Sequence, residues 1–230
     1  MKRFQAWVLL YALALTGDLV GISAGLQSLH FYCKPLLMPL LIWGLISNKK
    51  KLQNRPWILI AAGLLLSWAG DLFLLFENKN PAFFIGGLAS FLLAHICYIA
   101  YYIKCGASLT TALKTRKIWL GLAVLYSVGL VVLLLPKLGA LLVPVIAYAA
   151  VLTMMLISSI AAIPAVTAKA SGLFVAGATA FVISDSALAI NKFYQPFSLA
   201  AVLIMITYGL AQWLITRGTL ANGNTKKNGQ

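Results

Sequence analysis

The sequence predicts an all-α polytopic membrane protein, a bundle of eight transmembrane helices with both termini in the cytoplasm. Three observations lead to this prediction: the composition, the regular recurrence of apolar runs and a one-sided placement of basic residues. Hydrophobic residues make up 62% of the 230-residue chain, charged residues only 10%, and the mean hydropathy is +0.94. Because so few polar side chains cannot cover the surface of a globular protein of this length, the chain is expected to lie in a membrane.

Eight apolar runs are long enough to cross a bilayer as helices, which requires about 20 residues. They cover residues 4–22, 29–47, 57–76, 82–103, 118–135, 140–163, 171–190 and 197–215. Polar residues, Pro or Gly separate consecutive runs, as expected for loops between spans. The first run follows Lys2 and Arg3 and resembles a signal peptide. No convincing cleavage site precedes Gly17 and Asp18, so we expect this run to be retained as a span.

The basic residues divide unequally between the two sides of such a bundle. Three lie on one side, Lys79, Lys137 and Lys192, and Lys34 lies inside a span. The other side holds Lys2, Arg3, Lys49, Lys50, Lys51, Arg55, Lys104, Lys114, Arg116, Lys117, Lys169, Arg217, Lys226 and Lys227. The positive-inside rule places this richer side, and with it both termini, in the cytoplasm. The net charge of +14 therefore follows mostly from topology.

A basic rim of this kind attracts the anionic headgroups of membrane lipids. No nucleic-acid partner is expected, because the charges are split among short loops without a recognisable binding module. We expect one domain, residues 1–220, followed by a disordered polar tail, residues 221–230. A short polytopic chain without targeting extensions suggests a multi-pass protein of a bacterial inner membrane. The sequence leaves the oligomeric state open.

No disulfide framework, metal site or other cofactor is expected. The two histidines, His30 and His95, form no HExxH or HxxxH pair. The cysteines are odd in number and lack CxxC spacing, which argues against both disulfides and a zinc knuckle. They lie in or beside apolar runs and are interpreted as small packing residues: Cys33, Cys97 and Cys105.

Three of the four acidic residues, Asp18, Asp71 and Asp185, lie within apolar runs or at their edge, where a carboxylate is costly and usually functional. Asp71 and Asp185 are each the fifteenth residue of a span. A helical rise of about 1.5 Å per residue therefore places both about 7 to 8 Å inside the outer end. Lys34 reaches the same depth from the opposite direction, and Asp18 joins the layer. The sequence thus predicts a polar cavity that opens outward and is lined by these four groups.

Structural interpretations of the same acids stay open. Asp71 and Lys34 can form an ion pair that merely orders the bundle. Asp18 can lie in interfacial water, and Glu77, which follows the third span, is expected to be a solvated loop acid. His30 lies one turn before Lys34 and can share its face.

Two residues of the fourth span also have two interpretations. His95 lies deeper than the carboxylates, so a hydrogen-bonded core histidine is as compatible with the sequence as a catalytic one. Tyr98 continues the helical face of His95 and could reach into the cavity.

Four separate blocks carry a family resemblance, and they follow one another in a fixed order. They are CKPLLMPLLI (33–42), SWAGDLFLL (67–75), GGLASFLLAHICYIAYY (86–102) and GATAFVISDSALAINKF (177–193). In these blocks the chain resembles the YhhN-like lysoplasmalogenases, eight-helix membrane enzymes that cleave the vinyl-ether bond of lysoplasmalogens. The resemblance implies a lysophospholipid substrate. It also implies catalytic roles for Asp71 and Asp185 and substrate-binding roles for Lys34, His95, Tyr98, Ser184 and Asn191.

The implied chemistry needs what the two carboxyl groups offer. A vinyl ether is protonated at carbon, the resulting oxocarbenium ion adds water, and the hemiacetal collapses to a fatty aldehyde and an alcohol. By analogy with glycoside hydrolysis, one acid delivers the proton while an ionised partner stabilises the cation. We expect Asp185 to be the acid and Asp71 the partner, because a neighbouring cation such as Lys34 favours an ionised carboxylate. Lys34 can alternatively bind the substrate phosphate.

Three other functions compete with this hydrolase. A proton-coupled transporter would use the same buried Asp and Lys residues, and helices broken at Pro35, Pro39 and Pro144 would suit it. An intramembrane aspartyl protease is disfavoured, because the residues before Asp71 read SWAGD and not GxGD. A purely structural protein would tolerate replacement of both aspartates.

Overall fold

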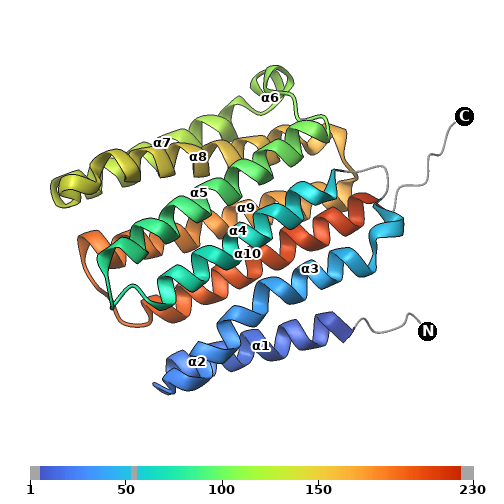
Figure 1. The fold of residues 1–230 in the computed structure, drawn as a ribbon. Coiled ribbons are helices and arrows are strands. Elements are labelled where there is room, and N and C mark those ends of the chain that lie inside the picture. Colours follow the sequence, from blue (N-terminus) through green and yellow to red (C-terminus); the bar gives the residue numbers. More distant parts are fainter. Residues whose placement is uncertain (1–5, 53–55, 224–230) are drawn as a thin grey trace, which may run out of the picture.

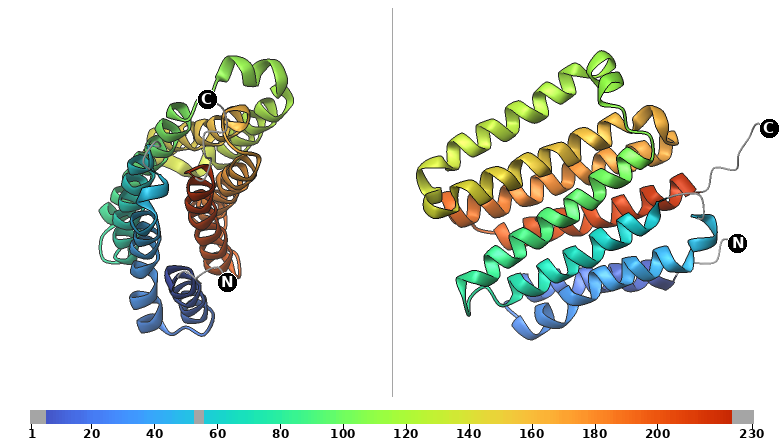
Figure 2. Two further views of the ribbon diagram at one scale, coloured as in Figure 1. Left: turned by 90° about the vertical axis from the view of Figure 1, so that its right-hand side faces the viewer. Right: turned by 45° about the horizontal axis from the view of Figure 1, so that its top comes forward.

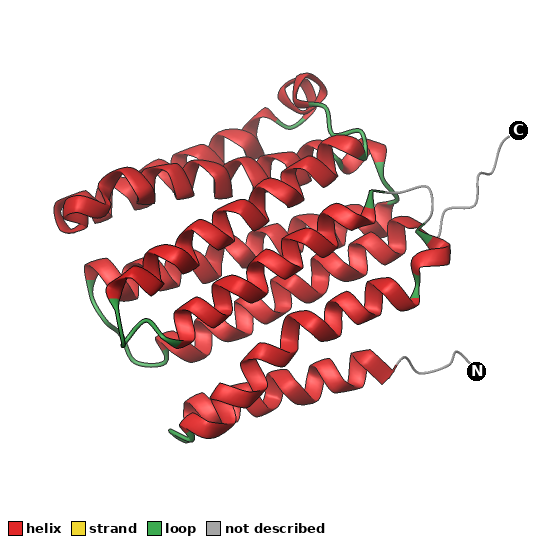
Figure 3. Ribbon diagram, viewed as in Figure 1, coloured by secondary structure: helices red, strands yellow, loops and turns green. Residues whose placement is uncertain are grey.

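The computed structural model describes residues 6–52 and 56–223, and every regular element in this part of the chain is a helix (Figures 1 and 3). The prediction of an all-α protein is therefore confirmed. Lys2 and Arg3, which flank the expected first span, lie outside the described residues. The helices are α1 (Ala6–Ser23), α2 (Gln27–Cys33), α3 (Leu37–Ser47), α4 (Trp57–Leu75), α5 (Pro81–Lys104), α6 (Leu109–Thr115), α7 (Lys117–Leu138), α8 (Leu142–Ala161), α9 (Ala168–Ala189) and α10 (Ala200–Gly223).

Seven helical stretches among the described residues are long and apolar enough to cross a membrane. One of them, Lys117–Ala161, contains both α7 and α8, which lie side by side in all views (Figures 1 and 2). The chain reverses between them at Gly139–Leu141, where Gly139 has φ +50°, a conformation that costs glycine little. With α7 and α8 counted separately, the number of spans is the eight that the sequence predicts.

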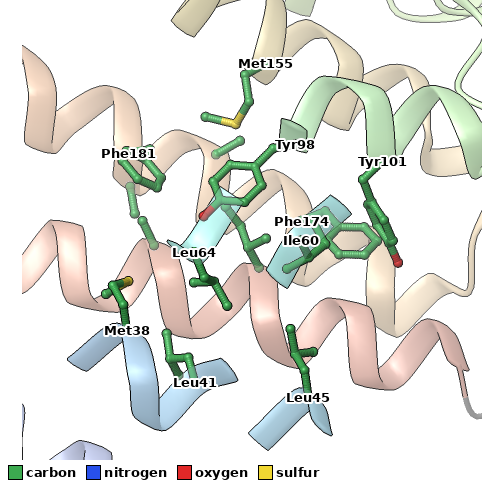
Figure 4. Packing of buried hydrophobic residues seen from close by; sticks show 14 of the residues in the cluster. Met38, Leu41, Leu45, Ile60, Leu64, Tyr98, Tyr101, Met155, Phe174 and Phe181 are labelled. Carbon is green, nitrogen blue, oxygen red and sulfur yellow. The ribbon is translucent and has the colours of Figure 1, made fainter. Parts of the chain in front are cut away.

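The helices form two facing rows when viewed along the bundle (Figure 2, left). One row contains α3, α4 and α5, and α9 and α10 lie opposite. Large buried side chains fill the space between them, including Met38, Leu64, Tyr98 and Phe181 (Figure 4). The core is thus built across the bundle, while α7 lies at its edge against α8.

The second span is broken where Lys34 occurs. It consists of α2, a 3₁₀ turn at Lys34–Leu36, and α3. Pro35 and Pro39 both lack a backbone N–H, so the Phe31 and Pro35 carbonyls lose the donors that a continuous helix would supply. The indole Nε1–H of Trp68, on α4, donates to the Pro35 carbonyl at 2.8 Å. The break is thereby tied to α4 one turn before Asp71.

The two ends of the bundle differ in their connections. α1 begins and α10 ends at the same end, and the short connections α1–α2, α4–α5, α7–α8 and α9–α10 lie at the other (Figure 1). α10 continues to Gly223, so the first three residues of the expected polar tail are helical. Residues 224–230 lie outside the described part of the chain, and the single-domain assignment stays a prediction.

Gly63 is expected to be indispensable for the contact between α4 and α5. A Cβ at this position would overlap the ring of Tyr98, which is wholly buried. Gly63→Ala is therefore expected to destabilise the protein by about 1–3 kcal/mol through overpacking. Thermal unfolding in detergent measures the effect, with Gly121→Ala as the control because a Cβ there meets nothing within 4 Å. Equal unfolding midpoints for the two variants would contradict this packing.

Trp68→Phe is expected to loosen the break in the second span. The variant removes the indole donor of the Pro35 carbonyl, and loss of a partner for a buried polar group costs about 1–3 kcal/mol. Trp119→Phe is the matched control, because Trp119 is 64% exposed on α7. A midpoint of unfolding lowered equally by both substitutions would show that the bond to Pro35 adds no stability.

Candidate active site

A partly open cavity of about 420 Å³ lies toward the end of the bundle that carries the α1–α2, α4–α5 and α9–α10 connections. Helices α1, α2, α4, α5, α9 and α10 all contribute to its wall. Its polar lining consists of Gln27, His30, Lys34, Asp71, Glu77, Asn78, Ser184, Asp185, Asn191 and Tyr208. Of the four groups that the sequence placed in one layer, Lys34, Asp71 and Asp185 line this cavity, and Asp18 does not.

Five of the seven expected site residues line this cavity: Lys34, Asp71, Ser184, Asp185 and Asn191. The other two, His95 and Tyr98, are wholly buried and do not line it. Tyr98 donates its hydroxyl to Gln212 Oε1 on α10 at 2.7 Å. The structure thus brings the two aspartates and the lysine together and leaves Tyr98 in the core. The functional roles of all seven stay predictions.

Asp71 has partners for both carboxyl oxygens. Oδ1 lies 3.9 Å from Nζ of Lys34, and Oδ2 accepts a hydrogen bond from the Tyr208 hydroxyl at 2.8 Å. Its side chain is 2% exposed. Tyr208 comes from α10 and is held edge-on by the rings of Phe91 and Phe181. A cation and a phenol together suit an ionised carboxylate, which can only accept hydrogen bonds.

Asp185 has different surroundings. Oδ2 accepts a hydrogen bond from the Tyr148 hydroxyl at 2.5 Å, and Nε2 of His95 lies 4.0 Å from the same oxygen. Oδ1 has no hydrogen-bond partner among the residues that the structure describes. In that same part of the chain no Lys or Arg lies within 4.0 Å of this carboxyl. The two aspartates are therefore chemically distinct.

His95 packs in the core beside Asp185. Its ring packs edge-on against Phe181, with centroids 4.7 Å apart, and against Tyr148 at 5.5 Å. It is wholly buried and does not line the cavity. The structure buries His95 in the core with Nε2 4.0 Å from Oδ2 of Asp185, and the choice between a core and a catalytic histidine stays a prediction.

Two expected substrate-binding residues also have structural contacts. Ser184 donates its hydroxyl to the Ile204 carbonyl at 3.1 Å and so joins α9 to α10. Asn191 lies in a π-helical turn, Ile190–Tyr194, and its Oδ1 accepts from the Phe197 backbone N–H at 3.3 Å. Both side chains therefore shape the α9–α10 end of the cavity.

The structure also locates the other two acidic residues, Asp18 and Glu77. Asp18 is wholly buried and accepts from Nδ1 of His30 at 2.7 Å, so it does not lie in interfacial water. It does not line the cavity itself, but His30 does. Glu77 lies in the turn after α4 and is partly exposed, as expected of a solvated loop acid, and it pairs with Lys192 at 3.3 Å. An apolar sequence pattern alone does not tell which neighbouring helix supplies a partner.

Sequence reasoning missed the two tyrosines that bond the aspartates. Tyr148 and Tyr208 lie inside α8 and α10, and not at the helix ends, where tyrosine is usually enriched in membrane proteins. A tyrosine buried at such depth needs a hydrogen-bond acceptor. That signal could have identified both residues as partners of buried carboxyl groups. It does not tell which tyrosine bonds which aspartate.

Comparisons with known proteins agree with the resemblance found in the sequence. Lysoplasmalogenases of Mycobacterium bovis and Mycobacterium tuberculosis are each 32% identical over 169 residues, which is 72% of this chain and 61% of each relative. Lysoplasmalogenase TMEM86A of Bos taurus is 31% identical over 163 residues, 68% of this chain and 62% of the relative. The chain thus spans less than two thirds of the relatives it matches. No solved structure matches it.

The family assignment rests on a longer match. The model of the YhhN family matches residues 29–219, a range that includes all four sequence blocks and every helix from α3 to α9. It also includes Lys34, Asp71 and Asp185. The protein belongs to the YhhN family.

Proposed function

We propose that this protein hydrolyses the vinyl-ether bond of lysoplasmalogens, releasing a fatty aldehyde and a glycerophospho-headgroup alcohol. The observation that carries the proposal is the presence of two buried carboxyl groups with unlike partners, Asp71 and Asp185, at one cavity of a membrane protein. The relatives' names supply the substrate class. No cofactor enters the proposal, because acid–base chemistry suffices for this reaction.

The partners of the two aspartates support unequal roles. Asp71 has a cation near one oxygen and a phenol that donates to the other, and both contacts favour the ionised carboxylate. Asp185 bonds Tyr148 through Oδ2 only, so its Oδ1 is available to carry a proton toward the substrate. We therefore assign Asp185 as the general acid and Asp71 as the charged partner.

The reaction then proceeds in balanced steps. Asp185 transfers its proton to the second carbon of the alkenyl chain, and the electron pair of the double bond forms the new C–H bond. Positive charge develops on the first carbon and the ether oxygen, where the Asp71 carboxylate stabilises it electrostatically. Water adds to the first carbon and returns a proton to Asp185. As the hemiacetal collapses, its hydroxyl loses a proton and becomes the aldehyde carbonyl. The bond from that carbon to the glycerol oxygen breaks, and the glycerol oxygen takes up a proton. One water is consumed overall.

The cavity lining suggests how the lipid is placed. Apolar side chains, including Phe91, Leu188 and Met205, accompany the carboxyl groups and suit an alkenyl chain. Gln27 and Asn78 belong to the α1–α2 and α4–α5 ends of the lining and suit a headgroup. If the basic rim faces the cytoplasm, as charge placement predicts, the headgroup lies at the outer surface of the inner membrane and both termini lie inside.

The transporter alternative uses the same residues but has less support. The named relatives are lysoplasmalogenases, and none of these names describes transport. The broken second span, which suited a transporter, has a local cause in Pro35 and Pro39 and serves to place Lys34 beside Asp71.

Replacement of either aspartate is expected to abolish hydrolysis. Asp71→Asn and Asp185→Asn should each lower kcat by at least about 100-fold, the usual contribution of a positioned acid or base. The measurement is release of fatty aldehyde from 1-alkenyl lysophospholipids, with choline or ethanolamine headgroups, by the purified protein in detergent.

Glu77→Gln is the matched control for the aspartate variants, because it makes the same carboxyl-to-amide change in a partly exposed pair and should keep its kcat. Unchanged thermal unfolding must accompany any loss of activity. Full activity in either aspartate variant would refute the two-carboxyl mechanism. No aldehyde from folded wild-type protein with either headgroup would refute the proposed function.

Tyr148→Phe is expected to reduce kcat by up to about tenfold while leaving KM nearly unchanged. The variant removes the hydroxyl that orients Asp185, and a hydrogen bond between neutral groups contributes about 0.5–1.5 kcal/mol. Its ring contact with His95 stays. Tyr126→Phe, on the exposed side of α7, is the control. If both variants retain wild-type kcat, Tyr148 has no part in positioning the acid.

A further inference from the structure

A second carboxylate contact lies beside the cavity and is not used by the proposed reaction. Asp18 on α1 is wholly buried, and its Oδ1 accepts from Nδ1 of His30 on α2 at 2.7 Å. Its Oδ2 has no hydrogen-bond partner among the described residues. A buried carboxylate with an unpaired oxygen lowers the stability of the fold, and such groups within membrane spans are usually functional. In the described part of the chain the only bonded partner of Asp18 is His30, so we expect that function at His30.

The packing of α1 on α2 holds this pair closely together. Gly17 and Gly21 lie one turn apart on α1, and both face α2. A Cβ on Gly21 would lie 2.7 Å from the His30 backbone nitrogen, and one on Gly17 would lie 2.8 Å from Sγ of Cys33. Small residues at this spacing let two membrane helices approach closely. The imidazole is therefore placed by the backbone contact as well as by Asp18.

His30 also shares the cavity with the catalytic groups. It precedes Lys34 by one helical turn, and both line the cavity wall. The Lys34 ammonium faces Asp71 at 3.9 Å and its side chain is only 10% exposed, whereas the His30 side chain is 29% exposed. Since Asp18 engages Nδ1, Nε2 is the ring nitrogen left for a ligand. The lysine charge is thus already partnered, and the histidine is the more accessible group.

We propose that His30 binds the phosphate of the lipid substrate and that Asp18 positions it for this task. In this arrangement His30 donates Nδ1–H to Asp18 and Nε2–H to a phosphate oxygen, and the second bond is charge-assisted because the phosphate is an anion. This inference rests on the proposed function, because it names how that substrate is recognised. Choline and ethanolamine lipids share the phosphodiester, so the contact serves both headgroups.

The order of groups along the wall matches the order in the substrate. In a lysoplasmalogen, the three glycerol carbons separate the vinyl ether from the phosphate. In the cavity, Lys34 lies at the aspartates, and His30 lies one helical turn closer to the α1–α2 connection. Glu77 also lines the cavity, but its carboxylate pairs with Lys192 at 3.3 Å, which offsets its repulsion of a phosphate. The vinyl ether can therefore lie at the aspartates while the phosphate reaches the imidazole.

The test compares two substrates that differ only in the phosphate. Wild type, His30→Gln and Asp18→Asn are assayed for aldehyde release from a 1-alkenyl lysophospholipid and from the matching 1-alkenylglycerol, which lacks the phosphate headgroup. His30→Gln is expected to raise KM for the phospholipid about tenfold or more, as loss of a charge-assisted bond predicts, with kcat little changed. KM for the alkenylglycerol should stay at the wild-type value. Asp18→Asn should shift the same KM in the same direction.

Three outcomes would overturn the inference. Equal changes in KM for both substrates in His30→Gln would show that the residue is structural. An unchanged KM for the phospholipid in His30→Gln would show that the residue does not bind the phosphate. An unchanged KM for the phospholipid in Asp18→Asn would show that Asp18 does not position His30. If His30→Gln does not fold, Asp18→Asn alone decides, because it keeps the shape of the buried side chain and removes the negative charge beside Nδ1 of His30.

A binding measurement separates this inference from the proposed reaction. A 1-alkyl lysophospholipid has a saturated ether that this chemistry cannot cleave, so its Kd reports recognition only. Binding to wild type that weakens about tenfold in His30→Gln would support phosphate recognition even if no aldehyde were formed. Equal Kd values would overturn it while leaving the hydrolase intact.

Discussion

A carboxyl group inside a helix bundle must find donors on neighbouring helices, and this requirement organises the structure. Asp18 joins α1 to α2 through His30, Asp71 joins α4 to the broken second span through Lys34 and to α10 through Tyr208, and Asp185 joins α9 to α8 through Tyr148. An unpartnered carboxylate at such depth would cost several kcal/mol. The same contacts that remove this cost gather the reactive groups around one cavity.

The break in the second span shows how a local backbone defect becomes part of a site. Two prolines interrupt the hydrogen bonds of the helix, and the indole of Trp68 supplies a donor to one of the affected carbonyls. Trp68 and Asp71 lie one turn apart on α4, and they meet Pro35 and Lys34, which are adjacent in the chain. Two neighbouring contacts thus set the position of the lysine. As a result Asp71 has a cation beside it, whereas Asp185 has none among the described residues.

Much of the fold and part of the site could be predicted from the sequence. Hydropathy identified the spans, and the constant rise of a helix placed Asp71, Asp185 and Lys34 at one depth, because both properties are local. Depth does not tell which side of a helix faces which neighbour. Tyr148 and Tyr208 were therefore missed, and Tyr98 was expected to approach a cavity that it does not line. The sequence also left open whether Asp18 lies in interfacial water or inside the protein. These outcomes depend on the packing of helices far apart in the sequence, such as α4 against α10.

The central claim is that this site protonates a vinyl ether at carbon, and the position of the transferred proton tests it most directly. Hydrolysis in D₂O, with immediate reduction of the aldehyde by borohydride to prevent exchange, should give product with one deuterium on the carbon next to the former carbonyl. Authentic aldehyde carried through the same mixture controls for exchange. Product without deuterium at that carbon would contradict the account, because the aldehyde would then have formed without protonation of the double bond.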